Sequence, residues 1–163
     1  NTVTMALPED GTRVLFWLKD AQLVAQLLPG TFPDYNQLIP KESQTTAIIP
    51  TPQLRNACKA ADIFAREAAH TARIKLIPGG ELTPGVLEVR ANSNELGSNE
   101  AVVDASIEGP EVEVAFNVKY LMDVLNVIDT PNVELRTNTA TSPGLLRPVG
   151  RDDFVHVIMP MRL

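Results

Sequence analysis

The sequence of 163 residues contains one cysteine, Cys58, and two histidines, His70 and His156. A single cysteine cannot form an internal disulfide or a multi-cysteine zinc site. Apolar runs are short, and none approaches the roughly 18–20 residues that a membrane helix needs. We see no N-terminal segment of charged and then apolar residues that would read as a secretory signal. We therefore expect an intracellular, cytoplasmic protein with no membrane partner.

Positive charge is also scarce, because 14 Lys and Arg residues face 20 Asp and Glu residues, for a net charge of −6. This balance disfavours a protein that is basic throughout, so any nucleic-acid contact must come from a local basic stripe. The sequence has no phosphate-cradling glycine loop, since Pro78-Gly79-Gly80 has the wrong flanks. The two histidines are far apart and read as surface or packing residues, and Cys58 reads as a small buried residue. We expect no catalytic residue, no metal and no cofactor.

The first part of the chain reads as β-structure. Strand patterns cover residues 2–7 and 12–19, while 21–28 fits either a third strand or a short helix. Pro29-Gly30 then ends this region. Three strands with no helix make a poor core, so we expect this region to be an incomplete unit.

From residue 47 onward the pattern alternates single helices with runs of strands. A strand over 47–51 precedes a helix from Pro52 to about Ala69, with Thr51 as its N-cap. A second helix starts at Asn117 as N-cap and runs to about Ile128. Strands are expected over 73–77, 86–91, 101–108, 111–116, 133–137, 144–147 and 154–161. This order predicts an α+β fold with antiparallel sheet and two helices.

The first predicted helix carries a polar stripe. At 100° per residue, four side chains fall within a sector of about 60°: Arg55, Lys59, Asp62 and Arg66. The opposite side is apolar: Leu54, Ala57, Cys58, Ala61, Phe64, Ala65 and Ala68. The stripe is either a solvated face or a row of cations aimed at phosphates, and Asp62 weakens the second interpretation. On the second helix the only cation is Lys119.

The C-terminus is unusually apolar for a chain end, since it reads Met159-Pro160-Met161-Arg162-Leu163. Methionines suit a surface that repacks around several partners, because they are flexible and polarizable. The alternative is a last strand packed into the core. The pattern alone leaves both open.

Four stretches in order resemble one family. They are FPDYNQLIP (32–40), NSNELGSNEA (92–101), AFNVKYLMDVLNVI (115–128) and VIMPMRL (157–163). Together they closely resemble the bacterial DNA polymerase III beta subunit, the sliding clamp, over roughly Thr12 to Leu163. The resemblance implies a chain of three similar domains, two copies of which join head to tail into a ring around duplex DNA. It also implies that residues 1–31 are the last strands of the second domain, 32–46 the interdomain connector and 47–163 the third domain, with the first domain and most of the second absent.

The resemblance further implies a pocket in which partner proteins dock a short peptide. The matching residues are Pro33, Gln37, Leu38, Asn117, Tyr120, Val157, Ile158, Met159, Pro160, Met161, Arg162 and Leu163. An apolar, methionine-lined cleft suits an extended peptide with one or two apolar anchors. The chain departs from the family at Gln37, where a basic residue is common, and at His156, where an aromatic is often found. The loop around Gly79–Pro84 is longer than is usual in that family.

In the family the helices line the inner wall of the ring. The resemblance therefore makes Arg55, Lys59, Arg66 and Lys119 candidates for phosphate contact with double-stranded DNA. It assigns Ile63 and Phe64 to the contact with the other protomer. The implied function is a non-catalytic processivity factor whose partners are the replicative polymerase, the clamp loader and other clamp-binding proteins. The rival hypothesis is a stand-alone α+β peptide-binding adaptor with no DNA role.

Overall fold

The computed structural model describes residues 2–32, 34–37, 39–40 and 42–162. The chain divides into two compact units, residues 1–34 and 35–163.

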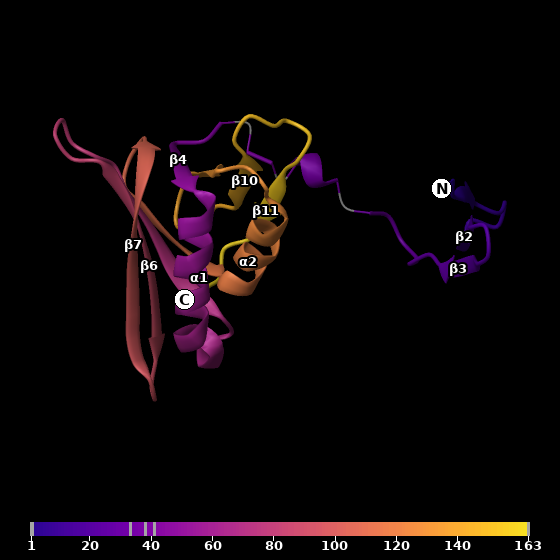
Figure 1. The fold of residues 1–163 in the computed structure, drawn as a ribbon, viewed down its shortest axis with the longest axis horizontal. Helices are drawn as coiled ribbons and strands as arrows, with labels where there is room; N and C mark the ends of the chain where they lie inside the picture. Colours follow the sequence, from indigo (N-terminus) through magenta and orange to yellow (C-terminus); the bar gives the residue numbers. More distant parts are fainter. Residues whose placement is uncertain (1, 33, 38, 41, 163) are drawn as a thin grey trace. The chain divides into compact units, whose positions relative to one another are not determined.

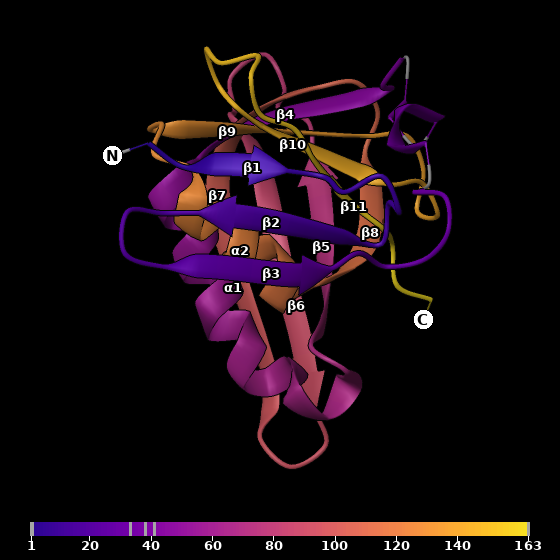
Figure 2. The same cartoon turned by 90° about the vertical axis from the view of Figure 1, so that its right-hand side faces the viewer.

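The first unit is a three-stranded antiparallel sheet of β1 (Thr4–Ala6), β2 (Arg13–Trp17) and β3 (Gln22–Gln26), in the order β1-β2-β3 (Figure 2). The region that sequence left open between strand and helix is therefore a strand. Met5 lies opposite Phe16, which lies opposite Leu23, so the three form an apolar row on one face. Most of these strand residues are exposed or half-buried within the unit.

The second unit is built on one eight-stranded antiparallel sheet in the order β11-β10-β9-β4-β7-β6-β5-β8. The strands are β4 (Thr45–Pro50), β5 (Thr71–Ile77), β6 (Gly85–Ser93), β7 (Gly97–Glu108), β8 (Val112–Asn117), β9 (Asn132–Thr137), β10 (Gly144–Pro148) and β11 (His156–Ile158). A short 3₁₀ helix, η1 (Tyr35–Gln37), precedes β4. The strand predicted for 154–161 is wrong in length, because Pro160 cannot donate to a ladder and pairing with β10 ends at Ile158.

Two helices pack beside each other against this sheet (Figure 1): α1 (Thr51–Ala65) and α2 (Val118–Val127). The prediction that Thr51 caps α1 is wrong. Pro50 is the N-cap, and Thr51 is the first helical residue, with Pro52 behind it. The α-helix also ends four residues before the predicted Ala69, because a 3₁₀ turn (Arg66–Ala68) and two left-handed residues, Ala69 and His70, follow. Ala68 is consequently exposed rather than buried.

The start of α2 matches its prediction. The Asn117 side-chain oxygen accepts from the Lys119 backbone N–H at 3.0 Å, which satisfies one of the free donors of the first turn.

The core lies between the helices and one face of the sheet. Ala57, Cys58 and Ala61 of α1 and Leu121 and Leu125 of α2 are buried against strand residues. The small side chains of α1 allow its backbone to approach the sheet and α2 closely. The largest fully buried side chains are Phe116, Ile49, Leu54, Ile74, Leu76, Leu87, Leu121, Leu125, Leu145, Leu146, Val89 and Val118.

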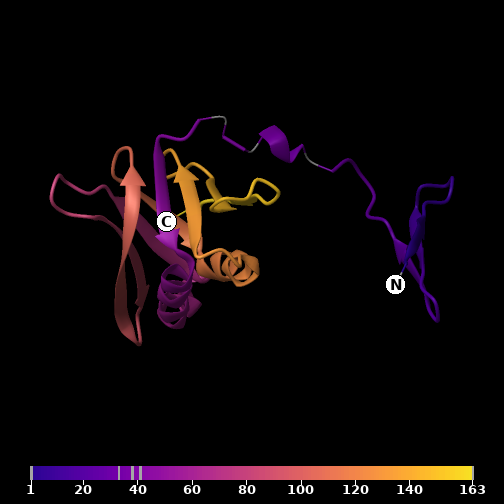
Figure 3. The same cartoon turned by 45° about the horizontal axis from the view of Figure 1, so that its top comes forward.

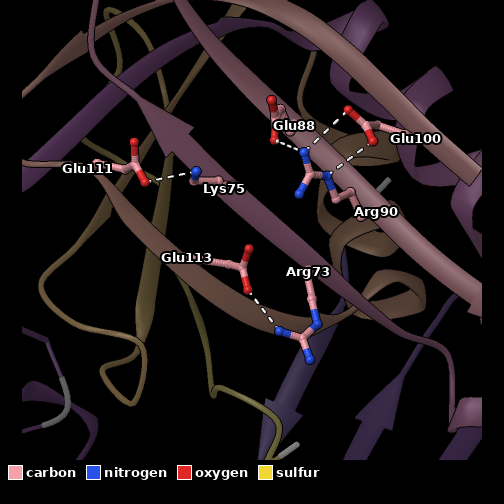
Figure 4. Close-up of polar contacts among 7 residues, drawn as sticks. All are labelled: Arg73, Lys75, Glu88, Arg90, Glu100, Glu111 and Glu113. Atoms are coloured by element: carbon pink, nitrogen blue, oxygen red, sulfur yellow. Dashed lines mark hydrogen bonds and ion pairs between the residues drawn. The ribbon is translucent and has the colours of Figure 1, made fainter.

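The opposite face of β8-β5-β6-β7 carries ion pairs across neighbouring strands (Figure 4). Arg73 donates to Glu113 at 2.9 Å, and the Lys75 ammonium lies 2.8 Å from Glu111. Arg90 contacts both Glu88 and Glu100. The hydrogen bond to Glu111 raises the pKa of Lys75 above its ordinary value. This charged face remains in water while Ala72, Ile74 and Leu76 point into the core.

Candidate functional site

The C-terminal segment lies between the edge strand β8 and helix α2. After β11 ends at Ile158, the Met161 backbone N–H donates to the Ala115 carbonyl of β8 at 2.8 Å. The yellow C-terminal segment runs near α2 in Figure 3, and β11 contacts α2. Met159 is 56% exposed, whereas Ile158 is buried. The chain end therefore combines the two alternatives: Ile158 packs into the core, and the residues after it form surface.

One groove, of about 320 Å³, separates this segment from α2. We call it the α2 groove. It is lined by Tyr120, Asp123 and residues 156–161. Burial lowers the pKa of His156 below its ordinary value, and the nearby Asp123 carboxylate opposes that shift. The groove is therefore mostly apolar, with three polar side chains at its wall.

A second groove, of about 890 Å³, lies on the other side of the segment, and we call it the β8 groove. Its lining residues are Arg73, Glu113, Ala115, Ala140, Thr141, Met159, Pro160, Met161 and Arg162. Because Met159, Pro160 and Met161 line both grooves, the segment forms an apolar ridge between them. A molecule placed in either groove would thus contact the segment.

Of the other predicted pocket residues, Tyr120 lines the α2 groove, whereas Asn117 and Gln37 do not line either groove. Asn117 lines neither groove, and its side chain is used in the junction of the helices. Gln37 ends η1, is exposed, and lines neither groove. Pro33, Leu38 and Leu163 lie outside the described residues.

The four predicted DNA-facing cations are all accessible. Lys59, Arg66 and Lys119 are exposed and Arg55 is partly buried. None of the four takes part in an ion pair with another described residue. The stripe is therefore free to meet an anionic partner.

The acidic member of the stripe, Asp62, is turned away from such a partner. Its carboxylate lies 2.6 Å from the Nδ1 atom of His70, and both side chains are mostly buried. The His70 carbonyl accepts from the Val118 N–H at 2.8 Å, and the Asn117 side-chain amide donates to the Ala69 carbonyl at 3.0 Å. These contacts join the end of α1 to the start of α2. From its place in the stripe Asp62 is expected to weaken the row of cations, but its contact with His70 removes it from the exposed face.

Helix α1, which carries the predicted protomer contact, packs against β7, a strand with an unpaired edge. Ile63 is 49% exposed, while Phe64 is partly buried against the core. β4 pairs with β7 only at Ser106, Ile107 and Glu108, whereas β6 pairs with the whole of β7 up to Ala105. Among the described strands, none pairs with the second side of β7 between Gly97 and Ala105. An open edge of this length is a template for a strand from another chain.

Sequence reasoning missed several groove residues. Asp123 follows ordinary helical spacing, and Ala140 and Thr141 lie in a loop, so no pattern marks them. His156 was noted as a departure from the family but not as a groove residue.

Burial raises the pKa of the Cys58 thiol to about 12, so this cysteine stays protonated in the core. Among the described residues no cluster of His, Cys, Asp and Glu could hold a metal ion, and none of their helices has the length and apolar character of a membrane span.

Comparison with known proteins connects these features. Residues 36–162 match the family model of the DNA polymerase III beta subunit, C-terminal domain. The chain is 30% identical over 159 residues to the beta sliding clamp of Synechococcus elongatus, covering 98% of this chain and 41% of that protein. It is 35% identical over 144 residues to the beta sliding clamp of Proteus mirabilis, covering 88% of this chain and 38% of that protein.

Solved structures agree with the sequence comparison. The crystal structure of the DNA polymerase III subunit beta from Pseudomonas aeruginosa matches with a TM-score of 0.87 and 30% identity, covering 99% of this chain and 42% of that one. The DNA polymerase III beta subunit from Thermotoga maritima matches with a TM-score of 0.82 and 26% identity, covering 98% of this chain and 42% of that one. The chain thus spans about two fifths of the length of these relatives. It belongs to the DNA polymerase III beta subunit family and contains that family's C-terminal domain.

Proposed function

We propose that this chain is part of a ring-shaped sliding clamp, a non-catalytic processivity factor that tethers the replicative polymerase and other clamp-binding proteins to duplex DNA. The observation that carries the proposal is the apolar ridge of Met159, Pro160 and Met161, with a groove on each side, in a member of the beta subunit family. In this proposal, residues 1–31 are the last strands of a second domain, 32–46 a connector and 47–163 the third domain.

The ridge is the proposed site for partner peptides. Tyr120 is 58% exposed beside Met159, so an aliphatic or aromatic side chain inserted into the α2 groove would bury apolar area on both. By resemblance, Asn117 and Gln37 are further candidates for contact with the peptide. In this proposal the partner peptide binds in an extended conformation across the ridge.

Peptide titration tests this site. A fluorescein-labelled peptide with two apolar anchors, acetylated and amidated Ser-Ser-Leu-Phe-Ser-Ser, is titrated with the chain, with the same chain lacking residues 159–163, and with Tyr120→Ala. We expect binding to be lost in the truncated form and weakened in Tyr120→Ala, because each removes a groove wall. Val127→Ala is the matched control, since Val127 is also an exposed residue of α2 but lines neither groove. Equal affinity of all four proteins would refute the site.

The α1 and α2 cations are the proposed DNA contacts. Phosphate contacts release counterions, so binding to duplex DNA should be weak, independent of sequence and steeply reduced by salt. We expect the triple variant Arg55→Gln, Lys59→Gln, Arg66→Gln to flatten the dependence of affinity on salt concentration. Base-specific binding that persists at high salt would contradict this role.

The open edge of β7 and the exposed Ile63 are the proposed contact with a second protomer. A strand from the partner would satisfy the free backbone groups of β7, and Ile63 and Phe64 would add apolar contact at the end of α1.

The rival adaptor hypothesis predicts peptide binding without any salt-sensitive DNA binding. The two titrations therefore separate the hypotheses.

A further inference from the structure

We propose that the two grooves beside the ridge carry opposite charge and fix the direction of the docked peptide. The occupant is an extended peptide with a cationic side chain over Asp123, apolar anchors on the ridge and an anionic group over Arg162. This inference rests on the proposed peptide site and adds the charge pattern of the partner.

The charge of the α2 groove comes from Asp123. Its other polar lining residues are Tyr120 and His156. His156 pairs with Leu146, which is fully buried, so both side chains lie on the core side of the sheet where α2 packs. Burial keeps the pKa of His156 low despite Asp123, so the imidazole is largely neutral at neutral pH. Asp123 is exposed and appears in no ion pair with another described residue, which leaves one uncompensated negative charge at this groove.

The charge of the β8 groove has the opposite sign. Arg73 and Glu113 line it together and pair with each other at 2.9 Å, so their charges largely cancel. Arg162 is exposed and supplies the remaining positive charge. The other lining residues, apart from Thr141, are apolar: Ala115, Ala140, Met159, Pro160 and Met161.

These charges lie on the two sides of one apolar ridge, and this arrangement defines a polarity. A peptide that crosses the ridge meets a carboxylate at one end and a guanidinium at the other. Docking the same peptide in the opposite direction places two like charges together at both ends, which costs affinity and slows association. Both protein charges are exposed, so each contact is weak and screened by salt. We expect the matched direction to be favoured over the opposite one by about threefold to tenfold at low salt.

Two isomeric peptides test the polarity. Acetylated, amidated Lys-Ser-Leu-Phe-Ser-Asp and Asp-Ser-Leu-Phe-Ser-Lys, each with a nitroxide-labelled cysteine added before the first residue, have the same composition and anchors, but their charges match the grooves only when they dock in opposite directions. The Lys-first isomer should broaden the NMR signal of Asp123 more than that of Arg162, and the Asp-first isomer should do the reverse. A labelled neutral peptide with Gln at both ends is the reference, and the difference between the isomers should be smaller at 300 than at 50 mM NaCl.

Variants assign the effect to the two groups. Asp123→Asn and Arg162→Gln should each reduce the difference between isomers, and the double variant should abolish it. Asp104→Asn is the matched control, because Asp104 is an exposed acid outside both grooves. The same broadening pattern from both isomers on the unmodified chain would overturn the polarity while leaving the peptide site intact. Failure of all three peptides to bind would overturn both.

Discussion

The two units of this chain contain strands of similar composition but differ in how those strands are buried. In the first unit Met5 is 60% exposed and Leu23 is 55% exposed, although both are strand residues. In the second unit Ile74 and Leu87 occupy equivalent kinds of position and are 2% and 0% exposed. The difference is not in the strands but in the layer above them, because α1 and α2 cover the second sheet and no described element of residues 2–32 covers the first.

This contrast shows what a strand pattern can and cannot imply. Alternating or apolar-rich runs with turn residues between them are enough to form a three-stranded meander in residues 2–28. Burial requires a second layer, which those residues do not contain. The apolar row of Met5, Phe16 and Leu23 is thus a face without a partner in its own unit.

The largest expected effect comes from replacing one leucine by alanine in each of the two units. Leu125→Ala, at a fully buried position of α2, should lower the free energy of unfolding by about 2–5 kcal/mol, because it removes buried surface and leaves a cavity. Leu23→Ala should change it by less than about 0.5 kcal/mol, since Leu23 is already half in water. Guanidinium unfolding followed by far-UV circular dichroism measures the second unit, while emission of Trp17, the only tryptophan, reports the first. Equal losses in the two variants would contradict the comparison.

The next effect concerns the uncovered sheet. β1 and β3 are edge strands with exposed apolar side chains, so copies of this chain should associate through residues 1–34. Sedimentation velocity over a range of concentrations should show a rising mean mass, and Leu23→Lys on β3 should suppress the rise. Leu82→Lys is the control, because Leu82 is 97% exposed in the second unit. If both variants associate as the unmodified chain does, another surface is responsible.

Much of the fold could be predicted because its signals are local. The Asn117 cap, the turn residues and the period of the apolar positions depend on near neighbours, and they placed α2 and most strands within a few residues. The ends of α1 were less predictable. Thr51 has the chemistry of a cap, but Pro50 occupies that position, and the left-handed Ala69 and His70 end the helix through contacts with α2.

The groove residues that could be predicted are the chain end and Tyr120, which belong to stretches that resemble the family. Met159, Pro160 and Met161 stand together at the chain end and match a family motif. Asp123 and Thr141 reach the ridge only through tertiary packing, which no spacing rule reports. The same applies to Asp62, whose contact with His70 depends on the turn after α1. Its sequence position alone places it among the cations.

A smaller effect tests how closely the second unit is packed beside the ridge. A Cβ atom at Gly144 of β10 would lie 2.7 Å from Phe116 Cζ and 3.0 Å from Ile158 Cγ2. Gly144→Ala should therefore destabilise the chain by about 1–3 kcal/mol. Adding Phe116→Leu should recover part of the loss, because it removes the ring atoms that the new methyl meets. Thermal unfolding of the single and double variants measures this, and strictly additive losses would show that the two positions do not contact each other.

The smallest effect is the pH dependence that His156 contributes. Burial lowers the pKa of His156 in the folded chain, with Asp123 opposing the shift, whereas in the unfolded chain the group titrates near its ordinary value of about 6.5. The folded state therefore binds fewer protons, so the contribution of His156 to stability is complete above about pH 6.5 and declines as the pH falls through that value. His156→Gln should lose less stability than the unmodified chain between pH 7.5 and 5.5, by well under 1 kcal/mol because the imidazole is only half-buried. His70 is present in both proteins, so the difference between their urea midpoints isolates His156. Asp123→Asn should enlarge the loss, since it removes the charge that favours the imidazolium; a loss unchanged in both variants would show that His156 does not couple to folding.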